Sequence, residues 1–375
     1  MKILLTGGGS GGHFYPIIAV AQEINKQIKE RKLLNAELFY MAPTPYNPSL
    51  LFENGITFKQ VSAGKVRRYF SLLNFFDFFK TLFGVISATF KVFSIYPDVV
   101  FGKGGYVSFP PLFAARLLKI PIVIHESDTV PGRVNKWAGK FATKIAISYP
   151  ETAEFFPKEK VAFTGNPIRE ELVMPLTSGA HEFLQLEKNI PVILILGGSQ
   201  GSQIINETII DALPKLVEKY QVIHQTGKNN FEQVVETANV VLGNSSYKER
   251  YRPFDYLNVL SMRMAAGAAS VVISRAGSSI FEIAAWGVPS IIIPIADSNG
   301  DHQRKNAFAY ARAGACKVVE ESNLSDSIVI AECDRLIDNQ SEREVMSASA
   351  KAFFKKDAGE KIAREIINIA LSHEA

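Results

Sequence analysis

Two glycine-rich loops divide this sequence into halves that open in the same way. Gly7–Gly12 follows the apolar run Ile3–Leu5, and Gly197–Gly201 follows the apolar run Val192–Leu196. Each loop leads into a longer amphipathic stretch, as in the strand–loop–helix openings of nucleotide-binding folds. Glycines allow a backbone to approach a diphosphate, and the start of the following helix attracts negative charge. The repeated opening therefore predicts two Rossmann-like folds.

The rest of the chain supports an α/β fold with two domains. Short apolar runs alternate with amphipathic stretches, which predicts parallel sheets covered by helices. The 375 residues are enough for two domains of ordinary size. Asn166-Pro167 is a turn signal, so we expect an N-terminal domain over residues 1–165 and a C-terminal domain over residues 166–347. One amphipathic helix is expected over Ala348–Leu371, and it could pack on either half.

A third glycine cluster, Gly102–Tyr106, follows the predicted strand Val99–Phe101. A single loop of this kind could be only a tight turn between a strand and a helix. Three such loops at the carboxyl ends of predicted strands favour a ligand site, because open α/β sheets bind ligands there. The first loop also matches the dinucleotide pattern G-x-G-x-x-G, but the second predicted strand ends at Met41–Thr44 without the carboxylate that would bind ribose. A nicotinamide cofactor is therefore not expected.

Composition narrows the classes of function. The net charge of +4 is too small to indicate a nucleic-acid partner. The cysteines, Cys316 and Cys333, indicate neither a disulfide framework nor a zinc site, and a reducing cytoplasm fits them. The apolar run at the N-terminus is too short for a signal peptide. No stretch approaches the length of about 18 charge-free apolar residues, so no transmembrane helix is expected.

A series of motifs runs along the chain in a fixed order. It comprises Thr6–His13, Gly104–Ser108, His125-Glu126 with Pro131-Gly132 and Asn135-Lys136, Gly165–Arg169, Leu196–Gly201, His224–Lys228, Arg275–Gly277 with Glu282, and Asp301–Gln303 with Asn306. In this order the motifs resemble those of the undecaprenyldiphospho-muramoylpentapeptide β-N-acetylglucosaminyltransferases. This family makes lipid II from lipid I in peptidoglycan synthesis.

The resemblance implies the GT-B fold, in which two Rossmann-like domains face each other across a cleft and the final helix commonly returns to the N-terminal domain. It implies inverting transfer of N-acetylglucosamine from UDP-GlcNAc to the muramoyl 4-hydroxyl of lipid I, without a cofactor. UDP-GlcNAc, lipid I and other proteins of cell-wall synthesis are thus the expected partners. Two alternatives stay open: a related glycosyltransferase that uses another lipid acceptor such as diacylglycerol, and a non-catalytic module that binds a nucleotide sugar or a lipid.

The implied reaction needs a base for the acceptor hydroxyl. His13 is the first candidate, because it lies where the glycine loop enters a helix expected over 16–32, and an imidazole titrates near neutral pH. The alternative role for His13 is a hydrogen bond to the acceptor or to the helix end. Glu126 is the rival base, although a His-Glu pair at a strand end can equally be structural. The resemblance implies an acceptor side made of Gly104, Gly105, Tyr106, His125 and Glu126.

The departing diphosphate needs its charge stabilised. Ser199 and its neighbouring amides precede the helix expected from Gln203, and Ser10, Gly11 and Gly12 hold the same place in the first half. No Asp-x-Asp motif occurs, so no metal site is expected. The resemblance alone implies further donor contacts: Arg169 at the phosphate, Phe254 at the uracil, Glu282 at the ribose, and Gln303 at the sugar. Asp128 stands where many members carry an Asn that contacts the sugar.

An aromatic and basic stretch extends from Lys65 to Tyr96. The simpler interpretation is a helix packed on the sheet. The other is a membrane patch, in which cations attract anionic lipid and phenylalanines enter the acyl boundary. Because a polyprenyl acceptor stays in the bilayer, and the resembling family is peripheral on the inner leaflet, we expect the chain at the cytoplasmic face of the plasma membrane. The residues of the predicted patch are Arg67, Arg68, Phe75, Phe76, Phe79 and Phe83.

Overall fold

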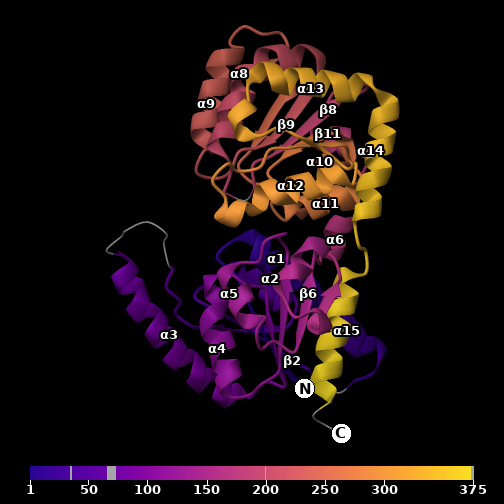
Figure 1. The fold of residues 1–375 in the computed structure, drawn as a ribbon. Coiled ribbons are helices and arrows are strands. Elements are labelled where there is room, and N and C mark those ends of the chain that lie inside the picture. Colours follow the sequence, from indigo (N-terminus) through magenta and orange to yellow (C-terminus); the bar gives the residue numbers. More distant parts are fainter. Residues whose placement is uncertain (34–35, 66–72, 199, 373–375) are drawn as a thin grey trace. The chain divides into compact units, whose positions relative to one another are not determined.

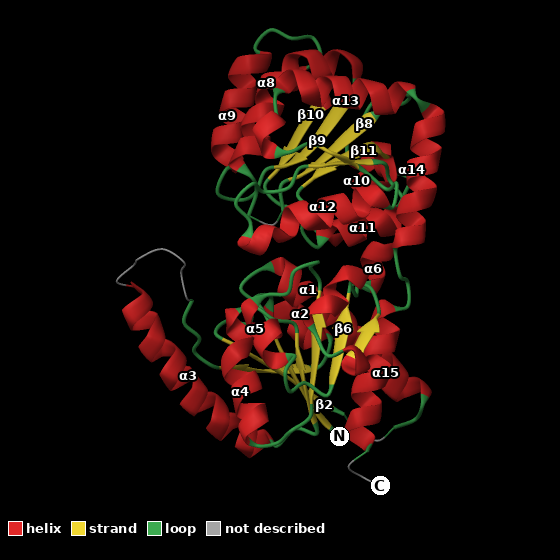
Figure 2. Cartoon of the chain, viewed as in Figure 1, coloured by secondary structure: helices red, strands yellow, loops and turns green. Residues whose placement is uncertain are grey.

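The computed structural model describes residues 1–33, 36–65, 73–198 and 200–372. They fold into two compact units, which Figure 1 colours by sequence. Unit 1 contains Met1–Arg169 and Lys355–Ala375, and unit 2 contains Glu170–Phe354. Each unit has its own parallel sheet, and Figure 2 shows the strands of each enclosed by helices. The predicted α/β class with two Rossmann-like domains is therefore confirmed.

The described part of unit 1 is built on a seven-stranded parallel sheet in the order β3-β2-β1-β4-β5-β6-β7. Because all the strands are parallel, their carboxyl ends meet at one edge, where the first and third glycine loops lie. The strands are β1 (Lys2–Thr6), β2 (Glu37–Ala42), β3 (Ile56–Gln60), β4 (Val99–Gly102), β5 (Ile122–Glu126), β6 (Lys144–Ile147) and β7 (Val161–Phe163). The helices are α1 (Gly11–Glu30), α2 (Pro48–Glu53), α3 (Leu73–Ile95), α4 (Phe109–Leu117), α5 (Arg133–Ala138) and α15 (Ala358–Leu371).

The core of unit 1 lies on both faces of this sheet. Ile3 and Leu5 point into one apolar cluster with α1 and α15, whereas Leu4 points into the opposite cluster with α3 and α4. Successive side chains of a strand alternate between faces, so a strand covered on both sides is apolar at every position. This explains the short unbroken apolar runs from which the strands were predicted.

Unit 2 repeats the arrangement with a six-stranded parallel sheet, among its described residues, in the order β10-β9-β8-β11-β12-β13. The second glycine loop lies at the carboxyl end of its central strand β8. The strands are β8 (Val192–Leu196), β9 (Gln221–Gln225), β10 (Tyr251–Phe254), β11 (Ala269–Ser274), β12 (Ser290–Ile292) and β13 (Lys317–Val318). The helices are α6 (Glu170–Val173), α7 (Ala180–Phe183), α8 (Gln203–Lys219), α9 (Phe231–Leu242), α10 (Val259–Ala268), α11 (Ser279–Trp286), α12 (His302–Arg312), α13 (Asp326–Asp338) and α14 (Gln340–Phe353).

The prediction of one helix over Ala348–Leu371 is wrong. The chain forms two helices there, α14 and α15, and Phe354 between them has an extended backbone. Phe354 packs against the core of unit 2, whereas Ile366 and other residues of α15 are buried in the core of unit 1. The residues of α14 and α15 pack into two separate cores. The helical segment is therefore interrupted where the chain passes from the core of unit 2 to the core of unit 1.

The helix α3 carries an exposed row of large apolar side chains. The exposed fractions are 64% for Phe75, 61% for Phe76, 41% for Phe79 and 65% for Phe83. From Phe75 to Ile95 the helix is a candidate membrane span by length and composition, which was not expected from the sequence. It contains Asp77, Lys80 and Lys91, so it is not a charge-free apolar run. Arg67 and Arg68 lie outside the described residues.

Candidate active site

His13 lies in the first turn of α1, which begins earlier than predicted, directly after the first glycine loop. The Oγ of Ser10, the residue before the helix, lies 2.8 Å from His13 Nδ1. His13 Nε2 lies 3.7 Å from the position that a Cβ atom on Gly105 would occupy, so this side of the ring faces the third glycine loop. A hydroxyl group at one ring nitrogen fixes the orientation of the imidazole, which a general base requires.

The third glycine loop lies directly against the first. Gly105 has a φ of 77°, in the left-handed region that favours glycine. A Cβ atom on Gly105 would lie 2.9 Å from the carbonyl oxygen of Gly8, so a side chain would separate the two loops. The Tyr106 ring approaches to 3.2 Å from the corresponding position on Gly9. The structure thus brings the predicted acceptor residues of this loop next to His13.

Glu126 ends β5 as a buried carboxylate with several hydrogen-bond donors around it. It is 4% exposed. Its Oε1 accepts a hydrogen bond from the Asp128 backbone N at 3.1 Å, and its Oε2 accepts from Gly132 N at 3.0 Å and Asn135 Nδ2 at 2.9 Å. Burial and then the Asp128 charge raise the pKa of Glu126, while Lys103 and Asn135 oppose that rise. The carboxylate therefore fixes the loop that follows β5.

His125 and Asp128 flank Glu126 but are placed differently. The His125 side chain is fully buried, and its Nε2 lies 3.0 Å from Gly165 O and 3.2 Å from Ser148 Oγ. Burial, reinforced by a neighbouring positive charge, holds the pKa of His125 well below its usual value, so the ring is neutral. Asp128 is half-buried, and its carbonyl oxygen accepts a hydrogen bond from Thr152 Oγ1 at 2.9 Å.

Arg169 is the last residue of the first segment of unit 1. Its guanidinium carbon lies 4.1 Å from the centre of the Tyr15 ring of α1, and the residue is 6% exposed. This cation–π contact fixes the direction of the guanidinium group. The predicted phosphate ligand is therefore held beside the helix that follows the first glycine loop.

In unit 2 the second glycine loop is bound to the segment after β9. Gly201 has a φ of 77°, and a Cβ atom there would lie 1.9 Å from Thr226 O, so only glycine fits. Asn206 of α8 donates from Nδ2 to the same carbonyl oxygen at 3.0 Å. These contacts fix the start of α8, whose amide groups face the loop. Ser199, predicted to help bind the diphosphate, lies outside the described residues.

The other predicted donor residues lie at the same edge of this sheet. Phe254 ends β10, and its carbonyl oxygen accepts a hydrogen bond from Thr226 N at 2.9 Å. Glu282 is half-buried in the first turn of α11, which follows β11. Gln303 lies in the first turn of α12, and its Oε1 accepts a hydrogen bond from Ile295 N at 3.1 Å. In a parallel sheet these positions surround the place where ligands bind.

One buried ion pair at this edge was not predicted. Arg275 Nη2 lies 2.5 Å from Glu321 Oε1 and 2.7 Å from Ser202 Oγ, and the two side chains of the pair are 10% and 15% exposed. Glu321 Oε2 accepts a hydrogen bond from Ala296 N at 2.7 Å. The pair thus ties together the start of α8, the end of β11 and the loop after β12. Arg275 belongs to a motif of the sequence, but no pattern marked Glu321.

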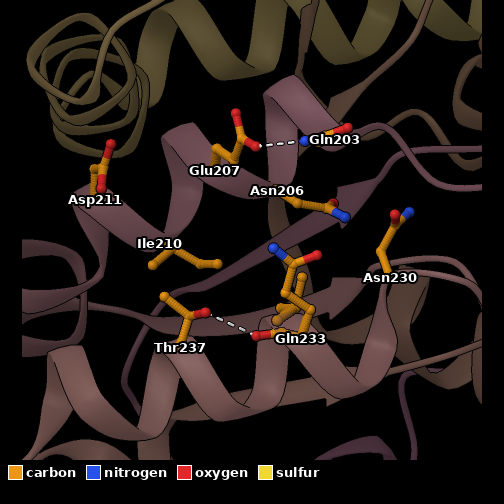
Figure 3. Close-up of a pocket in the computed structure, with 9 residues that line it drawn as sticks. Gln203, Asn206, Glu207, Ile210, Asp211, Asn230, Gln233 and Thr237 are labelled. Atoms are coloured by element: carbon orange, nitrogen blue, oxygen red, sulfur yellow. Dashed lines mark hydrogen bonds between the residues drawn. The ribbon is translucent and has the colours of Figure 1, made fainter.

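A groove of about 300 Å³ lies between α8 and α9, and Figure 3 shows its mostly polar side chains. Gln203 Nε2 donates a hydrogen bond to Glu207 Oε1 at 2.8 Å within it. None of the predicted donor residues that the structure describes lines this groove. Within the described ranges, no group of three or more His, Cys, Asp or Glu side chains could hold a metal ion. The residues lining the groove are Gln203, Asn206, Glu207, Ile210, Asp211, Asn230, Gln233, Val234 and Thr237.

Both halves of the chain match models of known domains. Residues 3–147 match the glycosyltransferase family 28 N-terminal domain, and residues 192–362 match the C-terminal domain of that family. The crystal structure of Acinetobacter baumannii MurG has a TM-score of 0.71 and 26% identity, covering 98% of this chain and 99% of that chain. A Bacillus cereus UDP-N-acetylglucosamine--N-acetylmuramyl-(pentapeptide) pyrophosphoryl-undecaprenol N-acetylglucosamine transferase 2 is 36% identical over 97% of this chain and 99% of its own length. The chain belongs to the MurG family.

Other comparisons agree with this family. A Clostridium tetani transferase with the same substrates in its name is 36% identical over 90% of this chain and 90% of its own. A Neisseria meningitidis UDP-GlcNAc 2-epimerase, at 16% identity and a TM-score of 0.69, shares the fold alone. Membership of the MurG family confirms the predicted resemblance and the predicted class of enzyme, a glycosyltransferase. The alternative of a non-catalytic binding module is thereby set aside.

Proposed function

We propose that this chain transfers N-acetylglucosamine, with inversion at C1, from UDP-GlcNAc to the muramoyl 4-hydroxyl of undecaprenyl-diphospho-muramoylpentapeptide (lipid I), giving lipid II. The observation that carries the proposal is the 36% identity, over nearly the full length of both chains, to a transferase named for this donor and acceptor. The glycine loops support it, because they place helix starts, which favour negative charge, at the ligand-binding edges of both sheets.

In this proposal His13 is the general base. It takes the proton of the 4-hydroxyl while the oxygen attacks C1, and the C1–O bond to UDP breaks with its electron pair leaving on the diphosphate. His13 is preferred to Glu126, because the Glu126 oxygens already accept three N–H groups. A carboxylate used in this way has little capacity left for a substrate proton. The start of α8 would stabilise the charge of the leaving diphosphate.

Transfer of label tests the proposal. Folded protein is incubated with UDP-[14C]GlcNAc and a short-chain lipid I analogue, and the lipid fraction is counted. Label in a product that contains muramic acid is the expected result. Parallel reactions with diacylglycerol as acceptor test the related activity that the sequence left open. Label in diacylglycerol and none in the lipid I analogue would reject the proposed acceptor.

We assign Glu282 to the ribose hydroxyl groups of the donor, as the family resemblance implied. Replacing Glu282 by Gln is expected to raise the KM for UDP-GlcNAc by about tenfold or more, because hydrogen bonds to a charged group contribute about 1.5–3 kcal/mol. Steady-state kinetics with varied UDP-GlcNAc give this value. The exposed Glu232 on α9, replaced by Gln, is the matched control. Equal KM values for the two variants would remove Glu282 from the donor site.

We assign the exposed row of α3 to the membrane surface, with α3 lying on the membrane rather than crossing it. Ala88 and Val92 are fully buried against the sheet of unit 1. Lys91 donates a hydrogen bond from Nζ to the carbonyl oxygen of Gln60, the last residue of β3 in the same sheet. A helix held along one side presents only its other side to lipid. The proposed contact of this surface is anionic lipid in the cytoplasmic leaflet, where the enzyme would bind lipid I.

Removing the phenylalanines of α3 is expected to weaken binding to vesicles. The triple variant Phe75→Ser, Phe79→Ser and Phe83→Ser should lose affinity by on the order of a hundredfold, since each Phe contributes about 1 kcal/mol when partly buried in lipid. Sedimentation with vesicles containing anionic lipid measures the loss. Phe52→Ser is the control, because Phe52 on α2 is 87% exposed and lies outside the row. Unchanged binding by the triple variant would contradict the assignment.

A further inference from the structure

Lys103 is a buried cation to which no role has been given. It lies in the third glycine loop, is 1% exposed, and its Nζ atom has no hydrogen-bond partner among the described residues. An ammonium group removed from water in this way costs free energy unless nearby negative charge compensates it. We therefore expect the buried ammonium group of Lys103 to have a function besides packing.

The aliphatic part of the Lys103 side chain is packed between neighbouring segments of unit 1. Strand β4, which ends one residue before Lys103, lies between β1 and β5, and the Lys103 backbone N donates a hydrogen bond to Thr6 O at 2.8 Å. A Cβ atom on Gly7 would lie 2.8 Å from Lys103 Cβ, so the stem is pressed against the first glycine loop. Lys103 follows Gly102, which pairs with Ile124 of β5. This register places Lys103 alongside the last residues of β5.

Two carboxylates supply the compensating charge. Burial lowers the pKa of Lys103 to about 8, and the charges of Glu126 and Asp128 oppose a larger fall. Lys103 is therefore still charged at neutral pH. His125 is neutral there, because burial and then the Lys103 charge lower its pKa. Other titratable side chains that approach the first and third glycine loops are those of His13 and Tyr15 on α1, Tyr40 on β2, Tyr46 and Tyr106.

Glu126 needs a positive charge nearby to keep its hydrogen bonds. All three of its donors are N–H groups, and a protonated carboxyl group would turn an O–H toward them. Burial and Asp128 raise the pKa of Glu126, and Lys103 is the cation that opposes them. Asn135, one of the donors, also contacts Gly104: its Nδ2 lies 2.8 Å from the position of a Cβ there. The ionisation state of Glu126 is thus linked, through Asn135, to the position of the third glycine loop.

We propose that Lys103 is a positioning residue: its ammonium group keeps Glu126 ionised, so that Glu126 holds the loop after β5, and through Asn135 the third glycine loop, beside His13. Its effect on catalysis rests on the proposed function, but its effect on Glu126 does not. Lys103 itself touches no substrate in this role.

The variant Lys103→Met removes the charge and keeps an apolar stem. In a pH profile from about 5.5 to 8.5, its kcat/KM for the lipid I analogue is expected to fall about tenfold at the acidic end, because loss of the cation raises the pKa of Glu126 further and favours its protonated form. The deficit should shrink as pH rises, because higher pH restores the carboxylate. The KM for UDP-GlcNAc should not change. Lys140→Met, at an exposed position of unit 1, is the control. The same deficit at every pH would overturn the proposal.

Thermal unfolding between pH 5 and 7.5 provides a readout without activity. Without Lys103 the pKa of folded Glu126 rises further above its unfolded value, so stability is lost as pH rises through that folded pKa. The Tm difference between the unaltered protein and Lys103→Met should therefore widen with pH. Adding Glu126→Gln to Lys103→Met should abolish the trend, since neither charge is left.

The outcomes separate this inference from the proposed function. If the unaltered protein transfers no label, the proposed function fails, while the widening Tm difference still supports the role of Lys103. A Tm difference independent of pH, with transfer intact, rejects the role of Lys103 alone. Should Lys103→Met not fold, Lys103→Met/Glu126→Gln is expected to fold, and its failure to do so would also reject the charge-based explanation.

Discussion

Replacing His13 by Ala is expected to lower kcat for transfer to lipid I by about a hundred- to ten-thousandfold, the range that a positioned general base contributes. The KM for UDP-GlcNAc should change little, because His13 lies in unit 1 against the third glycine loop and the assigned donor residue Glu282 lies in unit 2. Label transfer under saturating donor gives kcat, and varied donor gives KM.

Ser10→Ala is the graded control for His13. It removes the hydroxyl group 2.8 Å from His13 Nδ1 and leaves the imidazole in place. We expect a loss of only several-fold, because the imidazole is retained and loses only the contact that fixes its orientation. A His13→Ala variant with most of its kcat, or one whose loss lies entirely in KM for the donor, would exclude the base role.

Replacing Glu321 by Ala is expected to destabilise unit 2 by about 3–5 kcal/mol, the usual cost of removing one partner from a buried ion pair. Arg275 would then stay buried beside Ser202 without a carboxylate. The tryptophans allow a clean measurement, because Trp137 lies in unit 1 and Trp286 in unit 2. In a Trp137→Phe background, urea unfolding followed by fluorescence reports on unit 2.

Two further variants serve as controls for the Glu321→Ala measurement. Glu187 forms a pair with Arg250 at 2.7 Å but is largely exposed, so Glu187→Ala should have a much smaller effect. The double variant Arg275→Met/Glu321→Leu removes both buried charges and should recover much of the lost stability. Equal losses for Glu321→Ala and Glu187→Ala would show that burial of the pair adds nothing.

The sequence was most informative where backbone geometry limits the choice of residue. The loops around Gly105 and Gly201 accept only glycine at their points of closest approach, so their presence and their place at strand ends could be predicted. Strands such as β1 and β8, which are buried on both faces, could also be predicted, because nearly all of their positions are apolar. The place of His13 beside such a loop follows from the same topology, whereas the role of Glu282 was implied by the family resemblance alone.

The sequence was less informative where a residue's role depends on distant partners. Glu126 looked like a rival base, yet its oxygens are used by donors from residues 128–135, and only the folded loop reveals this. No sequence pattern indicated that Lys103, within the third glycine cluster, would be buried between neighbouring strands. The interruption at Phe354 arises because two cores lie on either side of it, which no local helical pattern records.

The return of the chain to unit 1 at its C-terminal end has a consequence for synthesis on the ribosome. The α15 side chains Ile362, Ile366 and Ile367 are almost completely buried in one cluster with Ile3, Phe14 and Ile17, which are synthesised long before them. Until the residues of α15 have been synthesised, this apolar surface lacks the helix that covers it. The half that is synthesised first therefore reaches its final packing last, after the intervening half has emerged.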